Sequence, residues 1–499
     1  MEAQADQKQA PVPISLRLGE AFREGLNVYN LGPVTSEQIA AADKAAADNY
    51  ADVHPGPQRV GLVRSVGAVP LSVKEGSALR ITLPDGGNLW TLAIRSPGAF
   101  GLRLHFTNFD VGAGSAIVYA RSADGVIVRG PYTGRGPGGR GEFWTASLPG
   151  DTAFIEVSGT DGPQLEVAEL LHFDRDLTGS VQDQAATAQV LPCHLDVMCA
   201  DFVNPMARDA VGRMNFVKDG LGFLCTGTLL EDLDGETVVP HMLTARHCIS
   251  TQAVTNTLEV VWLWQQSSCN GTLPNFASLP RNVSGTLLET NNGNDMSFIR
   301  LDGTVPGGVS LAGWTRAPLP DRPYGVHHPA GSFKRATLFD EHFLLISGCI
   351  FFDPGDYHFV RAINGVVQGG SSGSGIFNSA GQIMGQLYGI CCGLGHGLDC
   401  NESDCSNRDQ WRAVYGEFDT TFPIIERWLK LGGTIHVDGR FRGSELGTPD
   451  QPFNTVNEAN TFAWDGARIK IQAGPYREPV TFSKRLIVLA SGGSVTIGQ

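Results

Sequence analysis

Apolar and polar residues alternate along most of the chain, in short runs separated by turn-forming residues. The clearest examples in the first third are residues 78–83, 102–106 and 153–157. A period of two places successive side chains on opposite faces of a strand, so residues 14–175 are predicted to form a β-sandwich. One helix is expected at 36–49, which is rich in alanine and opens with Thr35 or Ser36 as its cap.

The remaining sequence changes character twice. Residues 176–190 are small and polar, which is typical of a linker. Residues 191–432 again carry strand-like runs and end in an amphipathic helix expected at 422–429. The tail, 433–499, has strand-like runs at 434–438, 468–471, 486–489 and 494–497. Its segment 447–456 resembles the opening rung of right-handed parallel β-helix proteins, so we expect a short β-helix-like module, either truncated or packed on the preceding domain.

Size, charge and cysteines limit the classes of function. A chain of 499 residues is expected to form roughly two to four domains. Its net charge of −14 gives no support for nucleic-acid or anionic-membrane binding, and no apolar run approaches the ~20 residues that span a bilayer. All ten cysteines lie between Cys193 and Cys405, which indicates a disulfide-bonded central domain and a secreted or periplasmic location.

Two questions remain about export and about the state of the cysteines. No signal peptide is visible in residues 1–13, so it was either removed or export uses another route. Cys391, Cys392 and His396 lie close together in sequence and offer a zinc site as the alternative to disulfides. The cysteines do not repeat as CxxC pairs, so the disulfide interpretation is preferred to zinc. The serine chemistry predicted below requires no metal and no organic cofactor.

Three short segments supply the parts of a serine-nucleophile site. They are TARHC with His247, NDMS with Asp295, and GGSSGSG with Ser372. His247 follows an apolar strand end and would act as general base, while Asp295 would orient its ring and stabilise the imidazolium. An aspartate before a strand is common in turns, so Asp295 gains weight from its place between the other two. The order His, Asp, Ser is the chymotrypsin order.

The serine segment suits acyl transfer physically. A serine hydroxyl needs a base to take its proton and donors to hold the developing oxyanion. Flanking glycines allow a sharp turn, so the amides of Gly370 and Ser372 can point at one oxygen. Ser372 takes the third place of a Gly-X-Ser-Gly pattern and is the candidate nucleophile, with Ser371 and Ser374 as alternatives. Apolar runs on both sides oppose a Gly/Ser linker.

With these motifs in view, residues 190–430 resemble the secreted bacterial lysyl endopeptidases of the chymotrypsin-like clan. The resemblance extends to CHLDVMC at 193–199, VWLWQQSSC at 261–269, AGW at 312–314, HHP at 327–329 and GQLYG at 385–389. It implies a double β-barrel with bridges Cys225–Cys248 and Cys199–Cys269. It also implies a third bridge from Cys193 to Cys391 or Cys392, and it leaves Cys349, Cys400 and Cys405 open.

The resemblance also implies a substrate pocket. A trypsin pocket carries an acid six residues before the nucleophile, where this chain has Val366. The lysyl endopeptidases place their acid downstream, in a segment resembling RDQW at 408–411, which makes Asp409 the candidate partner of a basic substrate side chain. Asp404 is the neighbouring alternative, and a solvated loop acid is the plainer interpretation. Tyr388 replaces the family's histidine as an aromatic wall, which puts strict lysine preference in question.

Activation is the last expectation. Ser371 occupies the position at which trypsin-like zymogens have an aspartate that pairs with the new amino terminus, so this chain is expected to mature differently. The N-terminal region resembles the family's propeptide and is expected to inhibit the enzyme or assist its folding. No Lys and no other Arg lies between Arg175 and Arg208, so self-cleavage is expected at Arg175-Asp176, or another protease cuts 176–190. His327 and His328 are expected to be structural.

The sequence therefore predicts a mainly β protein. A chymotrypsin-like double β-barrel is preceded by a β-sandwich and followed by a short parallel β-helix-like module. The predicted function is a secreted serine endopeptidase that cuts peptides and proteins after Lys, with Arg as a further possibility. A chymotrypsin-fold peptidase of acidic or apolar preference is one alternative. A catalytically silent adhesion or matrix-binding protein is the other, because the protease fold can serve as a scaffold.

Overall fold

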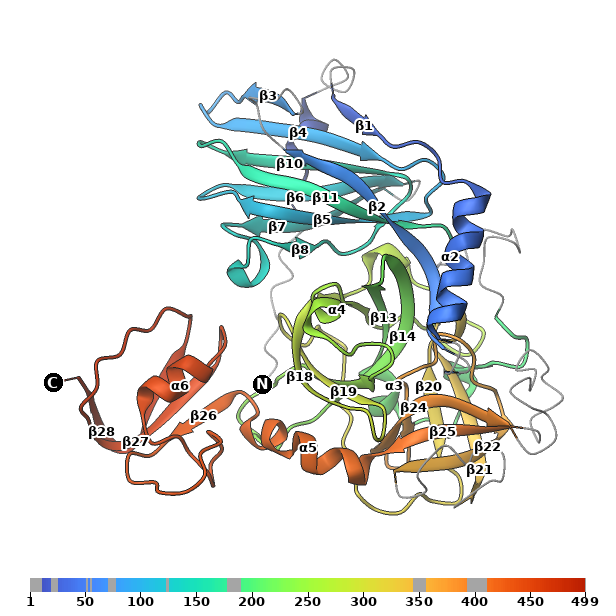
Figure 1. The fold of residues 1–499 in the computed structure, drawn as a ribbon, viewed down its shortest axis with the longest axis vertical. Helices are drawn as coiled ribbons and strands as arrows, with labels where there is room; N and C mark the ends of the chain where they lie inside the picture. Colours follow the sequence, from blue (N-terminus) through green and yellow to red (C-terminus); the bar gives the residue numbers. More distant parts are fainter. Residues whose placement is uncertain are drawn as a thin grey trace.

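The computed structural model describes residues 11–18, 26–50, 53, 56–70, 78–122, 125–176, 190–343, 356–392 and 411–498. Strands dominate these residues, as the alternating pattern predicts. Figure 1 shows three bodies: a strand-rich body at the top, a pair of barrels in the centre, and a smaller unit beside them that holds the end of the chain. Among the described residues, none of the helices combines the length and apolarity needed to cross a bilayer.

The N-terminal body is a two-layer sandwich. One layer is a sheet of β1 (Val28–Asn30), β4 (Asn88–Arg95), β10 (Thr152–Gly159), β6 (Ser115–Ser122) and β7 (Gly125–Thr133), with β3 (Leu79–Thr82) beside β4. The other holds β2 (Gln58–Pro70), β11 (Gln164–Phe173), β5 (Gly101–Asp110), β8 (Phe143–Trp144) and β9 (Leu148–Pro149). Their inward side chains, among them Trp90, Phe106 and Leu170, form one buried cluster. The predicted sandwich is therefore present.

The predicted N-terminal helix is confirmed as α2 (Ser36–Asn49). Thr35 is its N-cap: the side chain accepts from the amide of Gln38, and the side chain of Gln38 bonds back to Thr35. The helix leaves the sandwich and buries Ala42, Ala46 and Tyr50 against the first barrel.

The first barrel carries His247, which lies just after the end of one of its strands. It is built from β13 (Val211–Lys218), β14 (Leu221–Leu230), β15 (His241–Ala245), β16 (Glu259–Val261), β17 (Arg281–Val283), β18 (Gly285–Asn291) and β19 (Met296–Leu301). The short helices α3 (Pro205–Ala210) and α4 (Gln252–Asn256) flank it. Brief 3-10 turns lie at Ile14–Arg17, Pro137–Gly139, Val197–Cys199, Phe276–Ser278 and Pro329–Gly331.

The second barrel is a closed sheet. Its order is β12 (Leu195–Asp196), β21 (Arg335–Phe343), β20 (Tyr324–His327), β23 (Gly375–Phe377), β24 (Ile383–Cys392), β25 (Trp411–Glu417) and β22 (Tyr357–Asn364). The additional pairing of β21 with β22 closes the ring. Two barrels in one chain are the architecture that the resemblance implied.

One strand joins the sandwich to the first barrel. The N-terminal end of β2 pairs antiparallel with β14, with Gln58 opposite Leu224 and Leu62 opposite Leu221. Side chains add to this junction, since both the amide and the hydroxyl of Ser147 donate to Glu259 at 2.9 and 3.0 Å. The sandwich and the first barrel therefore share one continuous twelve-stranded sheet.

The helix after the second barrel is longer than predicted. We expected it at 422–429, but α5 runs over Phe418–Leu431. The apolar face continues one turn upstream, because Phe418, Phe422, Ile425 and Leu429 recur at helical spacing and are all buried. Pro423 lies inside the helix, which continues through it.

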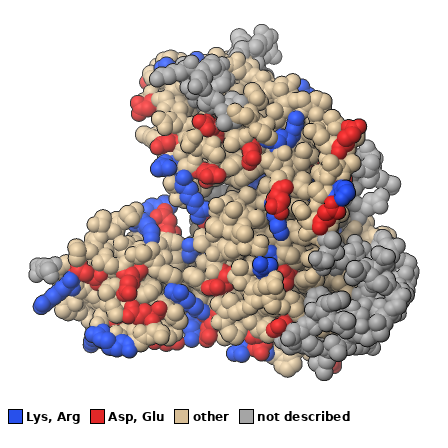
Figure 2. All heavy atoms as spheres, in the orientation of Figure 1, with Lys and Arg blue, Asp and Glu red and all other residues tan. Residues whose placement is uncertain are grey.

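The C-terminal unit contains β26 (Thr434–Val437), β27 (Arg468–Tyr476) and β28 (Ile487–Ile497) in a parallel sheet, with α6 (Val456–Phe462) packed on it. Its core includes Leu431, and Trp428 packs against that core, so the unit leans on the end of α5. In Figure 1 it lies beside α5, away from the sandwich. Figure 2 shows Lys, Arg, Asp and Glu side chains interspersed over this unit. Parallel strands suit the predicted β-helix-like module, but that assignment stays a prediction.

Candidate active site

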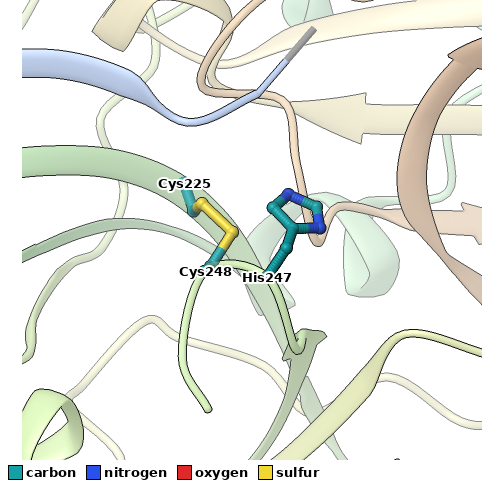
Figure 3. Close-up of side chains that lie close together, drawn as sticks. All are labelled: Cys225, His247 and Cys248. Atoms are coloured by element: carbon teal, nitrogen blue, oxygen red, sulfur yellow. A yellow bond between two sulfur atoms is a disulfide. The ribbon is translucent and has the colours of Figure 1, made fainter. Parts of the chain in front are cut away.

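His247 lies in a turn that a disulfide holds to the neighbouring strand. Strand β15 ends at Ala245, and Cys248 follows the histidine directly. Cys248 is bonded to Cys225 on β14, with 6.5 Å between their Cα atoms. Figure 3 shows the imidazole beside this bridge. Both sulfur atoms are bonded to each other, so this group of Cys225, His247 and Cys248 offers no thiolate pair to a metal.

The register of two strands brings Asp295 to His247. Strand β15 pairs antiparallel with β19, and Ala245 faces Met296. The residue before Met296 is therefore placed beside the turn that follows Ala245. The Oδ2 atom of Asp295 lies 2.6 Å from Nδ1 of His247, and Oδ1 accepts from the backbone amide of His247 at 2.9 Å. The predicted pairing of these two residues is present.

This contact fixes the tautomer of His247. An ionised carboxylate only accepts hydrogen bonds, so Nδ1 carries the proton and Nε2 keeps its lone pair. The side chains of His247 and Asp295 are 8% and 9% exposed. The Nε2 atom is buried and has no hydrogen-bond partner among the described residues. The accepting nitrogen of the ring is thus left without a partner among the described residues.

The serine loop packs against the same two strands. Gly373 has φ +81°, and a Cβ there would lie 2.2 Å from the hydroxyl oxygen of Thr244 on β15, so only glycine fits. The amide of Thr226 on β14, next to Cys225, donates to the carbonyl of Ser372 at 2.8 Å. Ser372 is almost fully buried. The loop with Ser372 is therefore held at the strand ends that position His247.

The alternative serines have other surroundings. The hydroxyl of Ser371 lies 2.7 Å from Nδ1 of His327, and the side chain of Ser374 lies beside Tyr415 in the second barrel. Gly370 has φ +92°, and its amide donates to no group within the described part of the chain. Such an amide is available to an oxyanion. His327 therefore contacts the residue next to Ser372, and the expectation that it is structural stays a prediction.

Aromatic rings line the site near His247. Tyr388 stands edge-on to His247, with ring centroids 5.7 Å apart, and Tyr357 stands edge-on to Tyr388 at 6.1 Å. Burial, with the charge of Asp295 adding to it, raises the pKa of Tyr357. Asp409 and the alternative Asp404 lie outside the described residues, as do Cys349, Cys400 and Cys405.

Sequence reasoning missed the N-terminal residues that lie beside the site. Tyr50, just beyond α2, places its ring edge-on to His247 with centroids 6.4 Å apart. Near the serine loop, the Gly56 carbonyl and the Gln58 side-chain oxygen lie within 3.4 Å of where a Cβ on Gly369 would be. No local motif marks these residues, since their position depends on the pairing of β2 with β14. The predicted linker, 176–190, falls almost entirely outside the described residues.

The remaining predicted disulfides have separate outcomes. Cys199 and Cys269 are bonded to each other, as the resemblance implied. Cys193 is also disulfide-bonded. Its pairing with Cys391 or Cys392 stays a prediction.

Comparison with known proteins places the chain in a family. The family model described as "Lysyl endopeptidase, C-terminal domain" matches residues 188–410, and "Lysyl endopeptidase N-terminal domain" matches residues 30–174. A lysyl endopeptidase of Pseudomonas aeruginosa is 27% identical over 432 residues, covering 72% of this chain and 85% of that protein. A secreted RxLR effector protein of Plasmopara viticola is 28% identical over 220 residues, covering 42% of this chain and 51% of that protein.

Among solved structures, the active form of the Rv3671c protease of M. tuberculosis matches with 14% identity and a TM-score of 0.30. That match covers 50% of this chain and 93% of the protease chain. Two β-barrels with this family match define a chymotrypsin-like serine endopeptidase. The chain belongs to the lysyl endopeptidase family.

Proposed function

We propose that this protein is a secreted serine endopeptidase that cuts after Lys, with Arg as the alternative, through an acyl-enzyme on Ser372. The observation that carries the proposal is the 2.6 Å contact between Nδ1 of His247 and Oδ2 of Asp295, with the serine loop packed on the same strands. Two cysteine pairs already bonded in the described chain support an oxidising, extracytoplasmic location.

Each residue has a defined step in this reaction. Nε2 of His247 takes the hydroxyl proton of Ser372 as the oxygen attacks the substrate carbonyl. Asp295 stabilises the imidazolium that forms, and the amides of Gly370 and Ser372 hold the oxyanion. His247 then gives its proton to the leaving amine. Water, activated by the same imidazole, hydrolyses the ester and frees Ser372.

Asp409 is proposed to select the basic residue. Val366, six residues before Ser372, is apolar and buried, so it gives no charge to a pocket. A buried carboxylate facing a lysine ammonium rejects neutral side chains because they would leave it unpaired. The test is a panel of peptides that differ only at the residue before the cut. The Asp409→Ala variant should lose the preference for Lys, while the matched Asp404→Ala variant should keep it.

The N-terminal sandwich is proposed to act as an intramolecular inhibitor. Tyr50 stands edge-on to His247, and it belongs to a core shared with Phe216, Phe223 and the Cys225–Cys248 bridge. The ammonium of Lys218 lies 4.9 Å from the centre of the Tyr50 ring and donates to the carbonyl of His247 at 3.1 Å. This packing is proposed to keep a peptide substrate from Nε2 until it opens.

Release is proposed to depend on a cut within 177–189 by another protease. Arg175, the alternative site, is engaged: its guanidinium pairs with Asp43 on α2 at 2.5 Å. Asp43 also binds Arg59, which pairs in turn with the buried Asp174 at 2.7 Å. Asp176 is itself buried. A protease cannot bind the Arg175-Asp176 bond in extended form while these contacts hold it.

A further inference from the structure

His327 lies fully buried beneath the serine loop and touches it directly. It ends β20, which pairs with β23, the strand that follows Ser372. Its Nδ1 atom lies 2.7 Å from the hydroxyl of Ser371, and its Nε2 atom lies 3.0 Å from the hydroxyl of Thr337. Nothing in the proposed reaction uses this histidine, so its position needs a separate explanation.

The hydrogen bonds around His327 run in one direction. Thr337 donates its hydroxyl proton to the carbonyl of Val366 at 2.8 Å, so its oxygen accepts from Nε2–H of His327. Nδ1 must then accept from the hydroxyl of Ser371. The hydroxyl oxygen of Ser371 in turn accepts from the amide of Gln368 at 3.2 Å. Every donor has an acceptor in this series of hydrogen bonds, which runs from the amide of Gln368 to the carbonyl of Val366.

Only a neutral imidazole fits this series of hydrogen bonds. A proton on Nδ1 would leave the Ser371 hydroxyl without its acceptor. Burial lowers the pKa of His327 well below its usual value, and the nearby His194, His328 and Arg335 act in the same direction. The ring is therefore neutral at neutral pH, as the hydrogen-bond directions require.

These hydrogen bonds hold the serine loop on both sides of Gly370. It holds the carbonyl of Val366, the amide of Gln368 and the side chain of Ser371. A second buried histidine adds to this, because Nε2 of His194 lies 3.1 Å from the side-chain oxygen of Gln368. The amide of Leu191 donates to the same oxygen at 3.3 Å. The start of the barrel region is thus tied to the loop by neutral groups.

We propose that His327 is a positioning residue: through the hydroxyl of Ser371, it fixes the amides of Gly370 and Ser372 in the direction that binds the oxyanion. This inference rests on the proposed function. Ser371 lies between the two amides, so its backbone torsions, together with those of Gly370, set the angle between them. All the groups involved are in place while the sandwich is still attached. The loop therefore needs no new charged amino terminus, and release only has to uncover the site.

The test uses three variants, each made in the full chain and assayed after processing: Ser371→Ala, Thr337→Val and His327→Asn. Folding is checked by thermal unfolding, and kcat and KM are measured with a lysine amide substrate. We expect Ser371→Ala to lower kcat roughly 10- to 100-fold with KM nearly unchanged, because misplaced amides weaken transition-state binding only. Thr337→Val should show a smaller loss of the same kind. His327→Asn should keep more activity than Ser371→Ala, because its side-chain oxygen still accepts from Ser371.

His241→Asn is the matched control, since His241 is similarly buried but packs beside the Phe298 ring in the first barrel. It should lose stability and keep kcat. A folded Ser371→Ala variant with the parent kcat would overturn the inference, even if His327→Asn does not fold. The proposed function fails separately, if the parent enzyme forms no acyl-enzyme on Ser372.

Discussion

The ring of Tyr50 stands edge-on to the ring of His247, with the two centroids 6.4 Å apart. One residue follows a helix of the N-terminal region, and the other is the candidate base. Tyr50 is 9% exposed and packs among barrel residues, so it belongs to the barrel core as much as to its own helix. In this account the uncut chain has an assembled site that is closed by packing.

Replacing Tyr50 should open the uncut chain. Removing a buried ring of this size costs about 3 kcal/mol or more, and that loss falls on the closed arrangement. Uncut Tyr50→Ala protein should hydrolyse a small lysine ester roughly 10- to 100-fold faster than the uncut parent. Tyr29→Ala, at an exposed position on β1, is the control and should change nothing. Equal rates for the parent and Tyr50→Ala would remove the inhibitory role of Tyr50.

Removing Arg175 should not prevent maturation. The Arg175→Gln variant deletes the only basic cleavage point between the sandwich and Arg208, so a self-directed cut there becomes impossible. We expect the same mature amino terminus, within 177–189, as for the parent, read by intact mass after exposure to the secreting culture. Accumulation of uncut Arg175→Gln chain would show instead that the enzyme cuts itself after Arg175.

The two disulfides should separate stability from activity. Cys225–Cys248 closes a loop with a sequence separation of 23 and holds the turn of His247. Replacing both cysteines by serine should cost about 3 kcal/mol of unfolding free energy and also lower kcat, because the imidazole loses its anchor. The same change at Cys199–Cys269, with a separation of 70, should cost stability and leave kcat unchanged. Urea unfolding and steady-state kinetics measure the two effects, and equal kcat losses would contradict the assignment.

Acid should weaken the junction between sandwich and barrel. Burial alone would raise the pKa of Glu259, but Arg103, Arg281, Asn215 and Ser147 outweigh it and lower the pKa from 4.5 to about 2. A carboxylate with a lowered pKa stabilises the fold above its unfolded value, and the contribution is lost as the pH falls through the folded value.

The uncut chain should therefore lose thermal stability between about pH 4.5 and about pH 2. A Glu259→Gln variant should be less stable at pH 7 and lose less on acidification. If parent and variant lose stability in parallel over this range, Glu259 is not the group responsible.

The motifs predicted His247 and Asp295 but not the N-terminal residues that lie beside them. His247 and Asp295 could be paired from sequence because strand ends and turn residues mark both, and the chain order restricts their roles. The position of Tyr50 could not be predicted, because it depends on which free strand edge β2 joins, and edge pairing leaves no local pattern. The link from His327 to Ser371 was missed for a similar reason: a buried histidine shows no periodicity that names its partner.

In the fold, too, elements marked by local signals were predicted and arrangements that depend on distant contacts were not. Helix α2 matched its prediction because alanines and a capping threonine are local signals. Helix α5 begins earlier than predicted because its apolar face extends one turn upstream to Phe418. The parallel register of β26, β27 and β28 depends on contacts between distant segments, so alternation alone indicated strands without their direction.

The central claim is that His247 activates Ser372 and no other serine. The most direct measurement treats the processed enzyme with a small organophosphonate and locates the label by peptide mass spectrometry. The account predicts one label per chain, on Ser372, which is lost in His247→Ala and strongly slowed in Asp295→Asn. A label on Ser371 or Ser374, or no label on folded enzyme with the N-terminal sandwich removed, would contradict it.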